Sequence, residues 1–394
     1  MKFNFLLALS LFSGITFAQG KFITDAGIAI NTNDFEEAKS AIEKAEEVIN
    51  QKQAANEKLE EKDLRKFWRY KEHIFVRLAE KQTDSLLKLN YLEKSKEASY
   101  KYFEVDKTKY YETEVKEDMV FLSSLYQNVG VDYFNKKDFP NAFLMFEVAL
   151  GINKFLGKDD FRVYHNAAFA AFYAKNYDKA ISYFNVLISN NYNEQKSLLN
   201  YKKSLIRAYS DQGNKEMALK KLSEFNSGDT ANVELLKEEI SILLEMNKPQ
   251  EALKTMDKLV NMGQKDALTY ENMGKLYEQI GDKDKALSAY KEALSLDSSK
   301  ADSYYGIGKI ICHEYNDINQ EINTLIKKHA DEKVIAAKEK ESVKKADEAL
   351  VYIEKALQYA PNDKDSLKLL LQIYENLDRK DKATEIKEKL SHLN

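Results

Sequence analysis

The chain has 394 residues, of which 31% are charged and 44% are apolar, and its formal net charge is −4. This composition is too apolar for a disordered chain, and the slight acidic balance provides no overall basic field that would attract nucleic acid. With only 3 prolines and 13 glycines, the chain is poor in turn-forming residues, which disfavours β-sandwiches and barrels and favours helices.

The first 18 residues have the plan of a secretory signal. Lys2 is a short positive region, Phe5 to Phe17 is an apolar stretch, and Thr16 and Ala18 place small side chains before Gln19. An apolar stretch of about 13 residues would cross only ~20 Å of a ~30 Å hydrocarbon core, which argues against a membrane anchor. We therefore expect a signal peptide over 1–18, cleaved near Ala18 and Gln19, and a periplasmic or secreted protein with no integral membrane segment after cleavage.

Residues 19–118 have a helical pattern without a clear repeat. Phe35, Ala38, Ile42 and Ala45 recur at helical intervals, and so do residues between 98 and 105. We interpret this part of the chain as degenerate or capping helical repeats that continue into the following array without a separating linker.

A clear repeat appears in residues 119–394. Its best unit runs from Tyr270 to Asp297, where Gly274 and Ala286 are small enough to let two antiparallel helices approach closely. The pair Gly281-Asp282 provides the turn between the two helices. Large residues at helical intervals, among them Tyr290, fill the space beside these small positions.

The alanine that corresponds to Ala286 recurs along the chain. These alanines stand at positions 142, 180, 218, 252, 286, 349 and 383. Their separations are 38, 38, 34, 34, 63 and 34 residues, so the 63-residue step is one period with 29 extra residues. In its small and aromatic positions and in its 34-residue step, the pattern resembles the tetratricopeptide repeat (TPR) family.

The resemblance implies an all-α fold, a right-handed TPR superhelix (α-solenoid) of about seven to nine helix pairs. The extra residues, near 314–345, contain no Gly or Pro and should prolong two helices into a long projecting hairpin. Ile318, Ile322, Leu325 and Ile326 form an apolar stripe along it. The hairpin is either a solvated tip without a role or a finger that binds a partner.

Motifs that suggest catalysis or metal binding fail on their spacing. The run Gly306-Ile307-Gly308-Lys309 lacks the spacing of a phosphate loop, and adjacent Cys312 and His313 point too far apart on a helix to share a metal. Cys312 is the only cysteine, so it can form no internal disulfide, and we expect it to be a small buried residue. We expect no enzyme activity, no cofactor and no bound metal.

The resemblance also implies a binding surface, because the first helix of each TPR pair lines a concave groove. The register of the repeats places ten residues in this groove: Val131, Phe134, His165, Phe169, Phe172, Tyr173, Lys203, Arg207, Tyr305 and Lys309. Aromatic side chains with a basic pair have the composition of a binding hot spot. The alternative is that the aromatic rings pack between helices and are not available to a partner.

These expectations lead to a function in binding. The chain is similar to exported multi-repeat TPR proteins of Gram-negative bacteria, which implies a protein–protein interaction scaffold or assembly factor in the cell envelope. The alternative is a protein that binds glycans or cell-wall fragments by stacking sugar rings on the groove aromatics. The fold by itself favours interaction and leaves the partner and pathway open.

Overall fold

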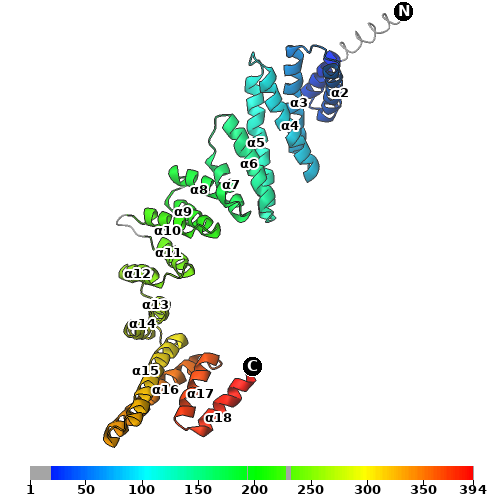
Figure 1. Cartoon of the computed structure of the whole chain (residues 1–394). Coiled ribbons are helices and arrows are strands. Elements are labelled where there is room, and N and C mark those ends of the chain that lie inside the picture. The colour runs from blue at the N-terminus through cyan, green and yellow to red at the C-terminus, as the bar shows by residue number, and fades with distance from the viewer. Residues whose placement is uncertain (1–18, 193, 228–231, 394) are drawn as a thin grey trace, which may run out of the picture. The chain divides into compact units, whose positions relative to one another are not determined.

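The computed structural model describes residues 19–192, 194–227 and 232–393, and this part of the chain contains helices and no strand (Figure 1). The all-α fold expected from the sequence is therefore confirmed. The signal peptide expected over 1–18 lies outside the described residues. In the described part, no helix combines the length and the apolar character needed to cross a membrane.

The chain divides into two compact units, one ending at Asn214 and the other beginning at Lys215. The change in repeat regularity near residue 118 falls inside the first unit. After helical residues 19–31, the helices of the first unit are α2 (Phe35–Ala54), α3 (Glu61–Lys81), α4 (Ser85–Val105), α5 (Glu112–Asn135), α6 (Phe139–Phe155), α7 (Phe161–Tyr173), α8 (Tyr177–Ser189) and α9 (Glu194–Asp211).

The second unit is also a series of helices. They are α10 (Lys215–Phe225), α11 (Val233–Glu245), α12 (Pro249–Asn261), α13 (Ala267–Gln279), α14 (Lys283–Leu296), α15 (Ala301–Lys327), α16 (Glu332–Tyr359), α17 (Lys364–Asn376) and α18 (Lys380–His392). In both units, helices that are neighbours in sequence pack against each other, as in an α-solenoid.

The periodic alanines lie where the repeat pattern predicts. All seven are buried: Ala142, Ala180, Ala218, Ala252, Ala286, Ala349 and Ala383. Six of them lie on the second helix of a pair, and Ala218 lies on α10. Small side chains at these points let the helices pack closely, which is the physical reason for the repeat.

Glycine provides the same close approach on the first helix of a pair. A Cβ atom added to Gly274 on α13 would lie 2.6 Å from the ring of Tyr290 on α14. A Cβ on Gly130 of α5 would lie 2.8 Å from the ring of Phe146 on α6. The two aromatic rings fill the space that the glycines leave, and both are buried.

The turn between α13 and α14 has the chemistry expected from its sequence. Gly281 has a φ of +82°, a left-handed conformation that favours glycine. Asp282 then caps α14, because its carboxylate accepts a hydrogen bond from the backbone N–H of Lys285.

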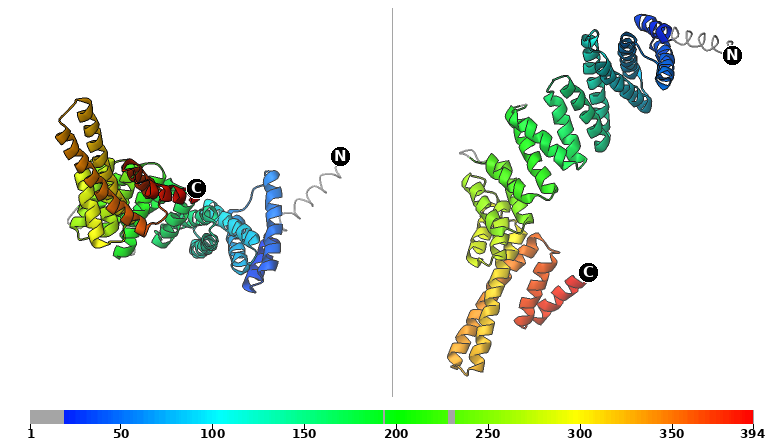
Figure 2. Two further views of the ribbon diagram at one scale, coloured as in Figure 1. Left: turned by 90° about the horizontal axis from the view of Figure 1, so that it is seen from below. Right: turned by 45° about the horizontal axis from the view of Figure 1, so that its top comes forward.

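The expected hairpin is formed by α15 and α16, which have 27 and 28 residues, against 13 or 14 in α11–α14, α17 and α18. The two helices run side by side and extend beyond their neighbours in the second unit (Figure 2). Contacts across the hairpin hold them together, with the Lys338 ammonium 3.0 Å from Glu321 and the Ser342 hydroxyl 2.6 Å from Asn319.

The motifs that suggested phosphate or metal binding have structural positions on α15. A Cβ on Gly306 would lie 2.4 Å from the Tyr290 ring, and one on Gly308 would lie 2.4 Å from Ile353. Both glycines therefore serve helix packing. Cys312 is 2% exposed, and burial raises the pKa of its thiol to about 11, so it is a buried apolar residue as expected.

Candidate functional site

Five of the ten groove residues predicted from the sequence line a single pocket in the first unit. The α5–α7 pocket has a volume of about 360 Å³ and is lined by Val131, Phe134, Asn135, Phe146, His165, Asn166, Phe169 and Tyr173. α5 and α7 supply most of these residues, spaced three or four apart, so each helix turns one face toward the pocket. Phe146 of α6 reaches the pocket beside Gly130.

The rings of the pocket are partly buried in one another and partly open to solvent. Tyr173 is 50% exposed and Val131 is 40% exposed, and both lie at the mouth. The Phe134 ring packs edge-on against Phe139 and Tyr173, with centroid distances of 5.2 and 6.0 Å. These rings therefore pack against one another, while Tyr173 and Val131 keep exposed surface at the pocket.

Deeper in the pocket, His165 is fixed by a contact with α9. Its Nδ1 atom lies 2.7 Å from the Tyr201 hydroxyl, and its ring packs 5.0 Å from that of Phe169. Burial lowers the pKa of His165, which favours the neutral imidazole at neutral pH. The pocket is then lined only by uncharged side chains.

The amides of Asn135 and Asn166 give the pocket its polar groups. In the described part of the chain, neither amide makes a side-chain hydrogen bond. An apolar cavity with a few unused donors and acceptors is the usual form of a ligand site. Such a pocket can hold an apolar side chain and orient the peptide group beside it.

The other five predicted residues lie elsewhere. Phe172 is half-buried and packs against Tyr177 and Phe184 of α8. Lys203 and Arg207 lie on α9, the helix that supplies Tyr201, but they do not line the pocket. The sequence suggested that this basic pair would extend the aromatic patch, and the residues that line the pocket do not include it.

Tyr305 and Lys309 belong to the second unit. They line a separate cavity of about 350 Å³ between α13, α15 and the start of α17. The Lys309 ammonium lies 2.9 Å from the Glu278 carboxylate, and this hydrogen bond raises its pKa. Of the ten predicted residues, five thus line the aromatic α5–α7 pocket and two line this charged cavity, while Phe172, Lys203 and Arg207 line neither.

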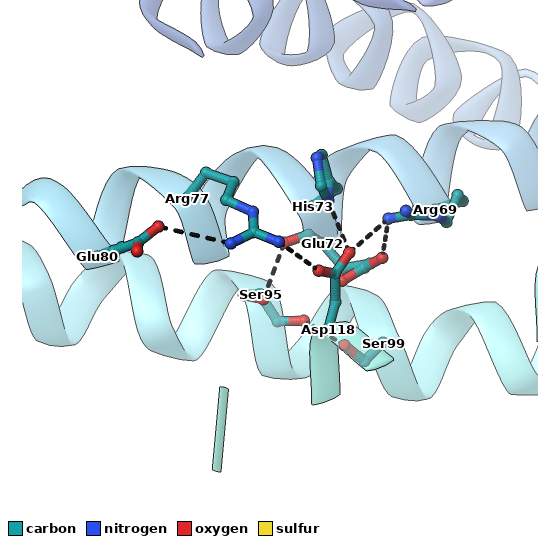
Figure 3. A network of polar contacts seen from close by, with 8 residues as sticks. All are labelled: Arg69, Glu72, His73, Arg77, Glu80, Ser95, Ser99 and Asp118. Atoms are coloured by element: carbon teal, nitrogen blue, oxygen red, sulfur yellow. Dashed lines mark hydrogen bonds and ion pairs between the residues drawn. The ribbon is translucent and has the colours of Figure 1, made fainter. Parts of the chain in front are cut away.

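Sequence reasoning missed a cluster of charged residues inside the first unit (Figure 3). Arg69 on α3 donates a hydrogen bond to Glu72 and another, of 2.8 Å, to Asp118 on α5. His73 Nδ1 lies 2.6 Å from the same Asp118 oxygen, and Arg77 lies 3.3 Å from the other. The carboxylate of Asp118 therefore joins three side chains of α3.

The buried cluster has two carboxylates with opposite electrostatic behaviour. Burial raises the pKa of Glu72 well above its ordinary value, and one of its oxygens has no partner among the described residues. Burial would also raise the pKa of Asp118, but its hydrogen bond with His73 and the charges of His73, Arg69 and Arg77 lower it overall. Glu72 is 0% and Asp118 5% exposed, so we assign the cluster a structural role.

A sequence signal for this cluster exists in retrospect. Arg69, His73 and Arg77 recur every four residues, so they share one face of α3. Charged residues at this spacing usually line a solvated face, so the pattern alone does not predict a buried cluster. Among the described residues, no group of His, Cys, Asp and Glu side chains is arranged to hold a metal ion.

The comparisons with known proteins agree with the repeat. Residues 267–300, which include α13 and α14, match the family described as tetratricopeptide repeat. No curated protein matches the chain.

Solved structures of repeat proteins are also similar to the chain. The C-terminal part of a TPR repeat-containing protein from Cytophaga hutchinsonii is 15% identical, with a TM-score of 0.47, over 68% of this chain and 95% of that one. A TPR repeats protein from Bacteroides fragilis is 21% identical, with a TM-score of 0.30, over 64% and 98%. A tetratricopeptide repeat protein from Parabacteroides merdae is 14% identical, with a TM-score of 0.32, over 77% and 98%. At these scores, the evidence for the fold comes from the helices themselves and from the family match.

Proposed function

We propose that this chain, which contains a tetratricopeptide repeat, is a protein-interaction scaffold that holds a segment of a partner protein in the α5–α7 pocket. The observation that carries the proposal is the pocket's chemistry. Its aromatic walls carry no charge, its mouth has Tyr173 half exposed, and its two amides make no side-chain hydrogen bond within the described residues. The proposed role is binding, not catalysis.

The pocket's size and polarity favour one kind of anchor. A volume of about 360 Å³ accommodates a large apolar side chain with part of its backbone. A charged side chain would lose its hydration there without gaining a partner of opposite charge. The partner segment should therefore present an aromatic or branched aliphatic residue, held by ring contacts and by hydrogen bonds to Asn135 or Asn166.

A binding assay with two exposed residues tests this proposal. Tyr173→Ala and Val131→Glu change the pocket mouth, and Tyr110→Ala and Val120→Glu are matched controls, since those residues are 65% and 40% exposed and lie outside the pocket. A photo-crosslinking amino acid at position 173 should capture a partner peptide that mass spectrometry can identify. The synthetic peptide should then bind Tyr173→Ala about tenfold more weakly than wild type. Equal loss in the control variants would refute the assignment of the site.

The second candidate is a glycan, since amides beside aromatic rings can also hold a sugar ring. The same variants decide between the two ligands. If glycan-array binding is lost in Tyr173→Ala while no peptide adduct forms at position 173, the ligand is a glycan and the scaffold proposal fails.

We also propose that the scaffold acts as an assembly factor outside the cytoplasm, in the cell envelope of a Gram-negative bacterium. The support is the signal-like plan of residues 1–18 in the sequence. In a Gram-negative host, the mature protein should be recovered from the periplasm or the medium with Gln19 as its first residue. Recovery of the full-length chain from the cytoplasm would contradict export.

A further inference from the structure

A second cavity of the first unit, which we call the lysine cleft, differs from the α5–α7 pocket in its charge. It has a volume of about 480 Å³ and lies between the end of α3, the start of α4 and the end of α5. Lys81, Lys88 and Lys136 come from these three places and line it together. Val129 and Tyr133 of α5 supply an apolar wall.

The three lysines of the cleft are not neutralised by ion pairs. Lys94, Lys96 and Lys101 of α4 each lie within ion-pair distance of a glutamate, with distances of 3.3, 2.6 and 2.8 Å. Lys88, the remaining lysine of that helix, forms no ion pair within the described residues, and the same holds for Lys81 and Lys136. The one contact of the Lys81 ammonium in this part of the chain is with the Phe35 ring, at 5.3 Å.

The carboxylates of the cleft compensate this charge only in part. Glu80 also lines the cleft, but it lies 3.5 Å from Arg77. Asp132 is the other acidic residue of the lining, and it is exposed to solvent. The lining therefore contains three lysines and two carboxylates, and one of these carboxylates, that of Glu80, already pairs with Arg77.

Next to the cleft, the first turn of α4 exposes apolar surface. Leu86 is 80% exposed and Leu87 is 40% exposed, and they stand between Ser85 and Lys88, both of which line the cleft. Exposed leucines beside lysines that form no ion pair within the described residues make a surface that fits an acidic and apolar partner.

The lysine cleft and the α5–α7 pocket use opposite faces of the same helix. The cleft is lined by residues 129, 132 and 133 of α5 and by its C-cap, Lys136, whereas the pocket is lined by residues 131, 134 and 135. At 3.6 residues per turn, these two sets point roughly 160° apart. Binding in the cleft is therefore independent of the ligand proposed for the pocket.

We propose that the lysine cleft is a second docking site, which takes an acidic peptide segment of a protein partner. Its glutamate or aspartate side chains would contact Lys81, Lys88 and Lys136, and its apolar side chains would cover Leu86 and Leu87. A scaffold with this site and the α5–α7 pocket can hold two segments at once, one on each face of α5.

The test uses a fluorescein-labelled helical peptide of leucine and glutamate residues, and its twin with glutamine in place of every glutamate. Binding to the full chain is followed by fluorescence anisotropy. The variant K88E/K136E reverses two charges of the cleft, and K44E/K62E makes the same change in net charge at exposed lysines on α2 and α3. We expect the glutamate peptide to bind K88E/K136E about tenfold more weakly than wild type. Its affinity for K44E/K62E should equal its affinity for wild type.

Three outcomes would overturn the proposal. Equal loss of binding in both double variants would mean that overall charge, not the cleft, attracts the peptide. Equal binding of the two peptides would mean that the lysines do not contribute. Binding to vesicles of anionic lipid that is lost in K88E/K136E, without peptide binding, would assign the cleft to a membrane surface. Tyr173→Ala should leave binding of the glutamate peptide unchanged, which separates this result from the test of the pocket.

Discussion

Two regions of the molecule hold their helices together by different means. In α13–α15 the close contacts depend on glycine, since the Tyr290 ring fills the space beside Gly274 on one side and Gly306 on the other. In α3–α5 the contacts depend on charge, since Asp118 binds Arg69, His73 and Arg77 below the surface. A region packed closely around glycine should lose stability when side-chain volume is added. A region held by buried ion pairs should lose stability when a charge is removed.

The largest effect is expected for Asp118→Asn. The amide would leave Arg69 with only the carboxylate of Glu72, whose burial already disfavours the charged form, and Arg77 with only the more exposed carboxylate of Glu80. Removing one partner of a buried ion pair costs about 3 kcal/mol or more. Trp68 of α3 is the only tryptophan of the chain, so its fluorescence during urea unfolding reports this region. An unchanged midpoint would show that the charges do not hold α3 to α5.

Gly306→Ala tests the region packed closely around glycine. The new Cβ would lie 2.4 Å from the Tyr290 ring, which cannot move away because Gly274 bounds its other side. We expect the unfolding free energy of α13–α15 to fall by about 2 kcal/mol, measured by hydrogen exchange of peptides from these helices.

The control for this change is Gly151→Ala on α6, where an added Cβ meets no atom within 4 Å. That variant should be as stable as wild type, or more stable by up to about 1 kcal/mol, because alanine favours a helix. The double variant Gly306→Ala/Tyr290→Leu should lose less unfolding free energy than the sum of the losses in the two single variants. Additive costs would mean that the ring and the glycine do not compete for the same space.

The same contrast explains what the sequence could predict. Alanine, glycine and aromatic residues repeat along the chain because each helix pair solves the same packing problem, so their spacing predicted the helices, the turn at Gly281 and the hairpin of α15 and α16. Five of the eight residues that line the α5–α7 pocket were predicted, because groove positions on α5 and α7 follow the repeat. The buried cluster has no such period, since Arg69 and Asp118 are 49 residues apart in the sequence and meet only when α3 and α5 lie side by side.

The smallest effect is expected for Glu72→Gln, and it should be stabilising at high pH. Glu72 has its pKa raised above the ordinary value of 4.5, chiefly by burial, so the folded state binds a proton that the unfolded state has lost. Wild-type stability should therefore fall, relative to Glu72→Gln, as the pH rises above 4.5 and toward the raised pKa of the folded state. Asp118 acts in the opposite sense, because its lowered pKa makes its contribution disappear as the pH falls below its ordinary value of 3.8.

A glutamine keeps the shape of the protonated glutamate, so Glu72→Gln should match wild type near pH 4.5 and exceed it by about 1 kcal/mol at pH 8. Urea unfolding followed by Trp68 fluorescence at several pH values measures this difference. If Glu72→Gln were less stable than wild type at pH 8, the Glu72 carboxylate would be a favourable partner of Arg69. The charged region would then be held by two carboxylates and not by Asp118 alone.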